Sequence, residues 1–185
     1  MSVIDWSNID SLNAKPKIRI LILGSYDTSA LPILRSIKDF IIGKGYVNTK
    51  LVMDFNNPTR RANETDAEYN LKRTEFWLPK ADVALFVFLK SEFNSSGVGF
   101  ELQHIIDHHP DMMWRSIVAW SQNPRPNVTT LVEGLVDRWK KSTNVIFFGS
   151  VNRLCDEIFG TLTSILGLFK NTVKTRGNEE WELDS

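Results

Sequence analysis

Five short apolar runs, alternating with stretches of helical spacing, constrain the fold of this chain more than any other feature. The runs occupy residues 18–23, 50–55, 83–89, 116–121 and 144–149. Helical patterns follow at residues 31–42, 64–78, 128–141 and 151–169, and a further helix is expected after the third run. Alternation of this kind is typical of a parallel sheet with right-handed crossovers and helices on both faces. We therefore predict a doubly wound α/β sheet of five parallel strands.

The third run and the residues that follow it form the segment that most strongly suggests a ligand-binding site. Residues 83–89 are almost continuously apolar, which favours a parallel strand covered on both faces. A loop rich in Ser, Asn and Gly follows, and a helix is expected to begin at about Ser96 or Gly97, with Glu101 in its second turn. We favour the flavodoxin-like strand order 2-1-3-4-5, whose switch point lies between strands 1 and 3. A ligand is therefore expected over residues 24–27 and 95–101.

The length of 185 residues favours a single domain with a substantial core. We expect a lead-in at residues 1–16, one α/β nucleotide-binding domain at residues 17–170, and a polar tail at residues 171–185. The predicted helix at 151–169 is apolar on more than one side, so we expect it to be deeply packed or to form an oligomer interface.

Composition excludes several classes of protein. Lysine plus arginine equals aspartate plus glutamate, 22 each, so no overall charge favours binding to nucleic acid or to an anionic membrane. The first ten residues lack the basic and apolar segments of a signal peptide, and no apolar stretch reaches the roughly 18 residues of a membrane span. The single cysteine, Cys155, lies among apolar residues and is expected in the core. We therefore expect a soluble, cytoplasmic protein with no membrane and no nucleic-acid partner.

Common cofactor and nucleophile motifs are absent. The chain has no G-x-G-x-x-G fingerprint, no phosphate-binding G-x-x-x-x-G-K-[ST] loop and no G-x-S-x-G elbow. Glu101, His104 and His108 have a spacing that could supply metal ligands, but a solvated helix end explains the histidines better. We expect neither a cofactor nor a metal site.

Glu101 is the strongest candidate for chemistry. A carboxylate at the mouth of the sheet, flanked by apolar residues, is expected to be partly desolvated with a shifted pKa. Such a carboxylate suits stabilisation or capture of the oxocarbenium-like centre that forms when an N-glycosidic bond breaks. Tyr26 and Asp54 follow the first two strands, where each has either a binding role or a role as turn residue or cap. Asp82, at the opposite end of the sheet, is interpreted as structural.

The segment ADVALFVF…SSGVGFELQHI resembles the signature of nucleoside 2-deoxyribosyltransferases and related nucleotide N-glycosidases. In those proteins a strand opening with Ala-Asp leads to a Ser-Gly-x-x-x-Glu turn whose glutamate is the nucleophile, and residues 96–101 match that spacing. The resemblance implies that Glu101 is catalytic and that Ser96 and Gly97 contact the substrate. The opening IRILILGSY is similar to the family's first strand and ligand-binding turn, which places Gly24, Ser25 and Tyr26 at the base or sugar.

The same segment also resembles TIR domains, in which a glutamate follows a Ser-x-x-x-x-Glu-Leu pattern, as in residues 96–102. Some TIR domains cleave NAD. Both resemblances imply cleavage or transfer of a bond between a ribose-type sugar and a base, with a nucleoside, a nucleotide or NAD as ligand. A non-catalytic nucleotide-binding or signalling module on the same fold is the alternative. The deoxyribosyltransferases complete their sites from a neighbouring subunit, so we expect a homodimer or larger oligomer.

Overall fold

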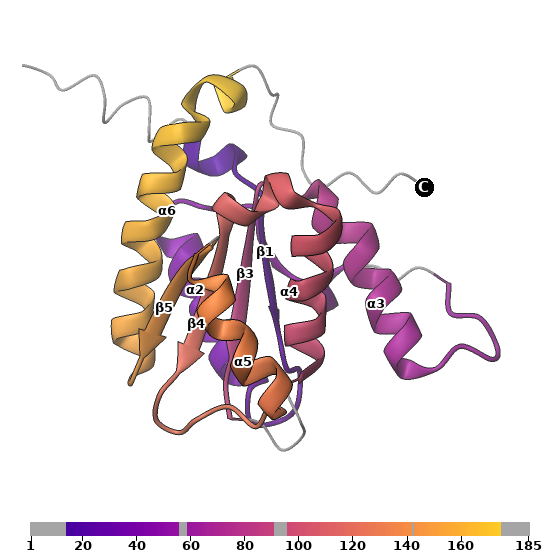
Figure 1. Ribbon diagram of the computed structural model, residues 1–185. Helices are drawn as coiled ribbons and strands as arrows, with labels where there is room; N and C mark the ends of the chain where they lie inside the picture. The colour runs from indigo at the N-terminus through magenta and orange to yellow at the C-terminus, as the bar shows by residue number, and fades with distance from the viewer. Residues whose placement is uncertain (1–13, 56–58, 91–95, 142, 175–185) are drawn as a thin grey trace, which may run out of the picture.

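A single five-stranded parallel sheet forms the centre of the molecule. The computed structural model describes residues 14–55, 59–90, 96–141 and 143–174 (Figure 1). The strands are β1 (Ile20–Gly24), β2 (Thr49–Leu51), β3 (Val83–Phe88), β4 (Ser116–Ser121) and β5 (Asn144–Phe148). Their order is β2-β1-β3-β4-β5, and every neighbouring pair is parallel. The predicted α/β doubly wound fold and its strand order are therefore confirmed.

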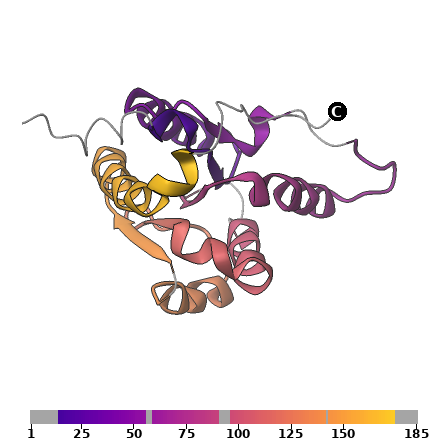
Figure 2. The ribbon, with the colours of Figure 1, turned by 90° about the horizontal axis from the view of Figure 1, so that it is seen from above.

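Helices cover both faces of this sheet, as the view from above shows (Figure 2). The α-helices are α2 (Leu31–Gly43), α3 (Asp66–Trp77), α4 (Ser96–His108), α5 (Thr130–Trp139) and α6 (Val151–Lys174). Short 3-10 helices connect them: η1 (Lys15–Lys17), η2 (Val52–Asp54), η3 (Leu78–Lys80) and η4 (Pro110–Arg115). Helices α2 and α6 cover one face, and α3, α4 and α5 lie on the other.

The alternation of side chains along β1 divides the core into two layers. Ile20 and Ile22 pack with the cluster beneath α2 and α6, whereas Leu21 and Leu23 pack with the cluster beneath α3, α4 and α5. This follows from the two-residue period of a strand. Every residue of β3 and β4 is buried, which explains why β3 and the central residues of β4 are apolar.

The second strand is shorter than its apolar run predicts. The run at residues 50–55 was expected to be one strand, but β2 ends at Leu51 and a 3-10 turn follows. The carboxylate of Asp54 accepts a hydrogen bond of 2.8 Å from the backbone N–H of Leu51. A local bond from an aspartate to the backbone competes with continued strand pairing, so the chain turns here.

Asp82 has the structural role expected of it. Its Oδ2 accepts the backbone N–H of Arg19 at 2.9 Å and lies 3.4 Å from Nε of the same arginine. The side chain is almost completely buried. Asp82 therefore joins the start of β3 to the residue before β1, at the end of the sheet opposite the loops that follow the strands.

Helix α6 is one-sided rather than apolar all round. Its buried residues are Leu154, Cys155, Ile158, Leu162, Ile165 and Leu166, which all pack into this chain's own core. Val151 and Phe159 are half-buried and pack against the same cluster, and the other side chains described in α6 are polar or glycine. Over residues 151–167 the apolar face of α6 is thus filled within the chain, and Cys155 is buried as expected.

Parts of both chain ends lie outside the residues that the structure describes. Helix α6 continues to Lys174, so the first four residues of the predicted tail, 171–174, are helical. Residues 1–13 of the predicted lead-in and 175–185 of the predicted tail lie outside the described residues. Within the described ranges, no helix combines the length and apolar character that crossing a membrane requires.

Candidate functional site

A pocket of about 760 Å³ opens where β1 ends and α4 begins. This is the carboxyl edge of the sheet beside its switch point, where open α/β folds bind ligands. The lining residues come from the β1–α2 turn, η2, α3 and α4. They are Gly24, Ser25, Tyr26, Asp27, Val52, Met53, Asn70, Leu71, Arg73, Thr74, Gly97, Val98, Phe100 and Glu101.

Gly24 forms part of the pocket floor as bare backbone. A Cβ atom at this position would lie 3.0 Å from both terminal methyl carbons of Leu34 and 3.2 Å from the carbonyl oxygen of Val87. These contacts are tighter than side chains normally make, so close packing of β1 against α2 and β3 favours glycine here.

The turn after β1 is fixed by Asp27. Its Oδ1 accepts the backbone N–H groups of Ser29 and Ala30, both at 2.9 Å, and its Oδ2 accepts the hydroxyl of Ser25 at 2.7 Å. Burial alone would raise the pKa of Asp27, but these bonds outweigh it and hold the pKa well below its ordinary value. Asp27 is therefore a charged residue that fixes the turn leading into α2, and Ser25 is bound to it.

Tyr26 ties β1 to η2 beneath the pocket. Its hydroxyl donates to the carbonyl of Ile22 at 3.0 Å and accepts the backbone N–H of Val52 at 3.3 Å. Burial, and then the nearby charge of Glu101, raise the pKa of Tyr26. The phenol is therefore neutral at ordinary pH, and its proton is engaged with the backbone.

Glu101 projects from the second turn of α4 to the pocket wall. Its Oε1 accepts the hydroxyl of Thr74 at 2.9 Å. Burial raises the pKa of Glu101 to about 7, although the hydrogen bond from Thr74 and the charge of Arg73 both lower it. Glu101 can therefore act as a carboxylate or as a carboxylic acid near neutral pH.

Arg73 is a buried cation on the same wall, with 9% of its surface exposed. One terminal nitrogen, Nη2, donates to the carbonyl of Val52 at 2.9 Å, whereas the buried Nε has no hydrogen-bond partner. Within the part of the chain that the structure describes, no carboxylate lies at ion-pair distance from Arg73. The pocket wall therefore contains a buried positive charge.

The mouth of the pocket is apolar. Met53, Leu71 and Phe100 line it, and each exposes more than a third of its surface: 37%, 40% and 54%. Solvent-exposed apolar side chains that gather at one cavity mark a binding surface. The site thus combines a polar interior with an apolar entrance.

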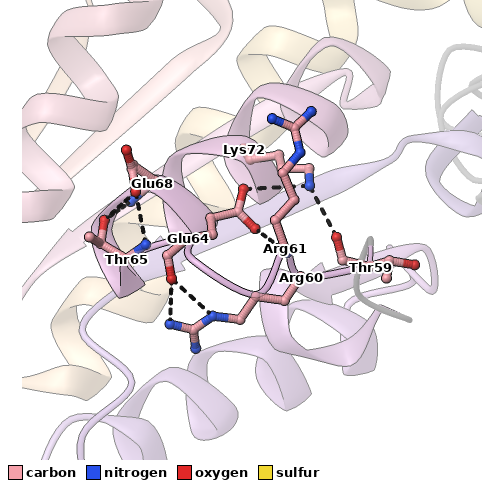
Figure 3. Close-up of polar contacts among 7 residues, drawn as sticks. All are labelled: Thr59, Arg60, Arg61, Glu64, Thr65, Glu68 and Lys72. Carbon is pink, nitrogen blue, oxygen red and sulfur yellow. Dashed lines mark hydrogen bonds and ion pairs between the residues drawn. The ribbon is translucent and has the colours of Figure 1, made fainter.

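Two sets of contacts hold α3 in place. At its start, Thr65 and Glu68 form a capping box: the N–H of Thr65 donates to Glu68 at 2.8 Å, and the N–H of Glu68 donates back at 3.2 Å (Figure 3). Lys72 pairs with Glu64 at 3.5 Å. At its end, Trp77 is buried and stacks on Phe55 with ring centroids 3.9 Å apart. The helix that carries Arg73 and Thr74 is therefore fixed at both ends.

Most residues expected at the site from the sequence come together. Gly24, Ser25, Tyr26, Gly97 and Glu101 all line the pocket. The backbone of Ser96 begins α4 as expected, and its side chain is not among those the structure describes.

Asp54 is the exception among these residues, because it does not line the pocket. Its carboxylate accepts the ammonium group of Lys38 at 2.8 Å and the N–H of Leu51 at the same distance. It is a strand-end cap, which is one of the two roles that the sequence allowed.

The contribution of α3 was missed from the sequence. Neither Arg73 nor Thr74 was predicted at the site from the sequence, yet both are buried in the wall. A signal was present: Arg73 and Trp77, like Thr74 and Leu78, are four residues apart, which places each pair on one helical face.

The histidines do not form a metal site with Glu101 in the described structure. Nε2 of His104 lies 3.4 Å from Oε1 of Glu75, and the His104 ring stacks on that of His108 with centroids 4.2 Å apart. Among the described residues, no group of three or more His, Cys, Asp or Glu side chains could hold a metal ion.

Comparison with known proteins gives no relative: the chain matches no protein-family model, no curated protein and no solved structure.

Proposed function

We propose that this protein cleaves or transfers the N-glycosidic bond of a nucleoside or nucleotide, with Glu101 as the reacting carboxylate. The observation that carries the proposal is the position of Glu101. It is a partly buried carboxylate with a raised pKa, in the wall of a large pocket at the carboxyl edge of a parallel sheet. Perturbed carboxylates in such pockets are the usual candidates for catalysis.

The proposed step breaks the bond between the anomeric carbon and the nitrogen of the base. The bonding electron pair leaves with the base nitrogen, which takes a proton from water or from a donor in the site. An oxygen of Glu101 either stabilises the oxocarbenium-like carbon or forms an ester with it. Water then completes hydrolysis, or the nitrogen of a second base completes transfer.

The shape and polarity of the pocket suit this class of ligand. The apolar entrance formed by Met53, Leu71 and Phe100 offers a surface for a flat base. In the polar interior, Glu101 offers hydrogen bonds to a sugar. A volume of about 760 Å³ lies within the range of small-molecule sites.

A second candidate is a non-catalytic nucleotide-binding or signalling module. One observation favours it: Tyr26 and Asp54, the two side chains considered for binding roles after the first two strands, both have partners within the protein and are not free to protonate a leaving base. The hydroxyl of Tyr26 donates to a backbone carbonyl, and Asp54 is paired with Lys38 outside the pocket lining. Under this alternative, the same pocket binds a nucleotide without cleaving its N-glycosidic bond.

A substrate panel separates the two functions. The wild type, Glu101→Gln and the control Glu133→Gln are incubated with deoxynucleosides, nucleoside monophosphates and NAD, and free base is measured by chromatography. Glu133 is exposed on α5 and lies outside the pocket lining. We expect Glu101→Gln to slow base release by roughly a hundred- to a thousandfold, since such losses follow removal of an electrostatic partner. Glu133→Gln should match the wild type.

Equal rates for the wild type and Glu101→Gln would show that Glu101 has another role. Binding of a panel member by calorimetry, without release of base, would establish the module instead. Release of nicotinamide from NAD alone would identify the TIR-like form of the activity.

The homodimer and the cytoplasmic location stay predictions. The apolar face of α6, one reason for expecting a dimer, is buried within the chain. Light scattering at micromolar concentration tests the remaining expectation, which rests on the resemblance to deoxyribosyltransferases. A monomeric mass would contradict it.

A further inference from the structure

Two neighbouring residues of α3 act on Glu101 from across the pocket wall. Thr74 is 1% exposed, and its hydroxyl donates to Oε1 of Glu101 at 2.9 Å. Threonine within a helix often donates instead to the backbone carbonyl four residues earlier. In the described structure this hydroxyl instead donates to a residue of α4, so the bond joins two helices.

The bond from Thr74 makes the two oxygens of Glu101 unequal. Oε1 is held, whereas Oε2 has no hydrogen-bond partner among the described residues. A carboxylate with one oxygen fixed has a defined orientation, and its other oxygen stays available to a ligand. Catalytic groups require orientation of this kind, because small misplacements cost large factors in rate.

Arg73 supplies the charge that a carboxylate at Glu101 needs. An arginine is permanently protonated, and a buried cation without an opposing charge is unfavourable. Within the described structure, Arg73 donates to the neutral carbonyl of Val52, and its guanidinium group lies over the ring of Tyr69, 5.7 Å from the centroid. Its charge is close enough to lower the pKa values of both Glu101 and Tyr26. Ionised Glu101 is therefore the compensating anion that this chain itself offers.

We propose that Thr74 and Arg73 are positioning residues for Glu101: Thr74 holds Oε1 so that Oε2 is presented to the pocket, and Arg73 keeps the group as a carboxylate. This inference rests on the proposed function for its purpose, but it concerns a state of Glu101 that is measurable without any substrate. The other titratable groups around Glu101 are accounted for. Tyr26 is neutral, and Asp54 is bound to Lys38.

The test is a titration of Glu101 by carbon-13 NMR, with glutamate labelled at the carboxyl carbon and the signal assigned by its loss in Glu101→Gln. The variants are Thr74→Val and Arg73→Met, each with a conservative partner, Thr74→Ser and Arg73→Lys. Thr161→Val on α6 is the control, since its hydroxyl bonds only within its own helix to Glu157.

Thr74→Val and Arg73→Met should each raise the titration midpoint of Glu101, by about one unit or tenfold in proton affinity. Thr74→Ser and Arg73→Lys should restore it, and Thr161→Val should leave it unchanged. If the wild type releases base, the acidic limb of its pH–rate profile should move with the NMR midpoint, and kcat should fall more than KM rises.

A midpoint that is the same in the wild type, Thr74→Val and Arg73→Met would overturn the inference, whatever the activity. If the titration midpoint of Glu101 shifts in the variants but the protein releases no base, the positioning role would be supported and the proposed reaction would be contradicted. Should Thr74→Val fail to fold, the pair Arg73→Met and Arg73→Lys still decides whether charge controls Glu101, and Thr74→Ala reports on the hydroxyl.

Discussion

Gly99 packs so closely against Val132 that a Cβ atom built on the glycine would lie 2.7 Å from Cγ1 and 2.9 Å from Cγ2 of the valine. This contact brings α4 against α5, and Glu101 lies two residues further along α4. The contact between α4 and α5 therefore helps to set the position of Glu101, the proposed catalytic group, relative to the sheet.

Gly99→Ala should destabilise the protein although alanine favours helix. The new methyl group overlaps a β-branched side chain with few alternative rotamers, so α4 and α5 must separate. Overpacking of this kind costs about 1–3 kcal/mol, which exceeds the roughly 1 kcal/mol gained in helix propensity. Urea denaturation measures the difference.

Gly134→Ala is the matched control, because a Cβ atom there meets nothing within 4 Å and the position is exposed in α5. It should stabilise the protein by about 0.5–1 kcal/mol. If both glycine variants gained stability, the close approach of Gly99 to Val132 would be wrong.

Glu101→Gln should change the pH dependence of stability. The pKa of Glu101 rises from its ordinary 4.5 to about 7 on folding, so the folded protein holds a proton that the unfolded chain releases. Stability contributed by this proton is complete below pH 4.5 and is lost as the pH rises to about 7. Relative to Glu101→Gln, the wild type should therefore become less stable across this window, by on the order of 2–3 kcal/mol.

Thermal or urea unfolding of both proteins between pH 4 and 8 checks this prediction. Parallel stability curves would mean that the pKa of Glu101 is not raised in the folded protein.

Tyr26→Phe should destabilise the protein without creating a large cavity in its core. The variant keeps the ring but removes the hydroxyl that accepts the N–H of Val52, a residue that is 4% exposed. A buried donor left without a partner costs about 1–3 kcal/mol. Equal unfolding midpoints in urea for Tyr26→Phe and the wild type would contradict the bridging role of the hydroxyl.

Asp82→Asn should lower stability more than the same change at a surface ion pair. Asp82 is buried and accepts the backbone N–H of Arg19, and removing its charge also weakens the contact with the guanidinium group. A loss of about 1–3 kcal/mol is expected.

Asp137→Asn provides the comparison, since Asp137 pairs with Lys140 at 2.8 Å on the surface of α5. Exposed pairs of this kind contribute about 0–1 kcal/mol. Chemical denaturation of both variants gives the ranking, and an equal effect would remove the distinction between the buried and exposed carboxylates.

The sequence predicted the sheet better than the site because the two depend on different information. Strand order followed from local patterns and from the general behaviour of parallel sheets. Helix α4 begins at Ser96, as expected, since the preceding loop has turn-forming residues. The end of β2 was missed because the backbone N–H of Leu51 donates a hydrogen bond to Asp54 there, and the hydrophobic pattern does not reveal such a bond.

Thr74 shows why part of the site could not be read from the sequence. It bonds to Glu101, which lies 27 residues away in the sequence, and no local sequence pattern near either residue identifies its partner. The contact depends on where α3 lies, which the stacking of Trp77 on Phe55 helps to fix. Only the packed structure brings the hydroxyl to the carboxylate.

The bare backbone at Gly24 has a consequence for how the ligand preference of this pocket could be changed by protein engineering. Because a Cβ atom there would lie 3.0 Å from the methyl carbons of Leu34 and 3.2 Å from the carbonyl oxygen of Val87, a mutant library at that position should mainly return destabilised protein. Met53, Leu71 and Phe100 are exposed and belong to η2, α3 and α4 rather than to the sheet, so they tolerate replacement. Directed evolution of a new specificity should therefore accumulate its substitutions at the entrance and leave the floor unaltered.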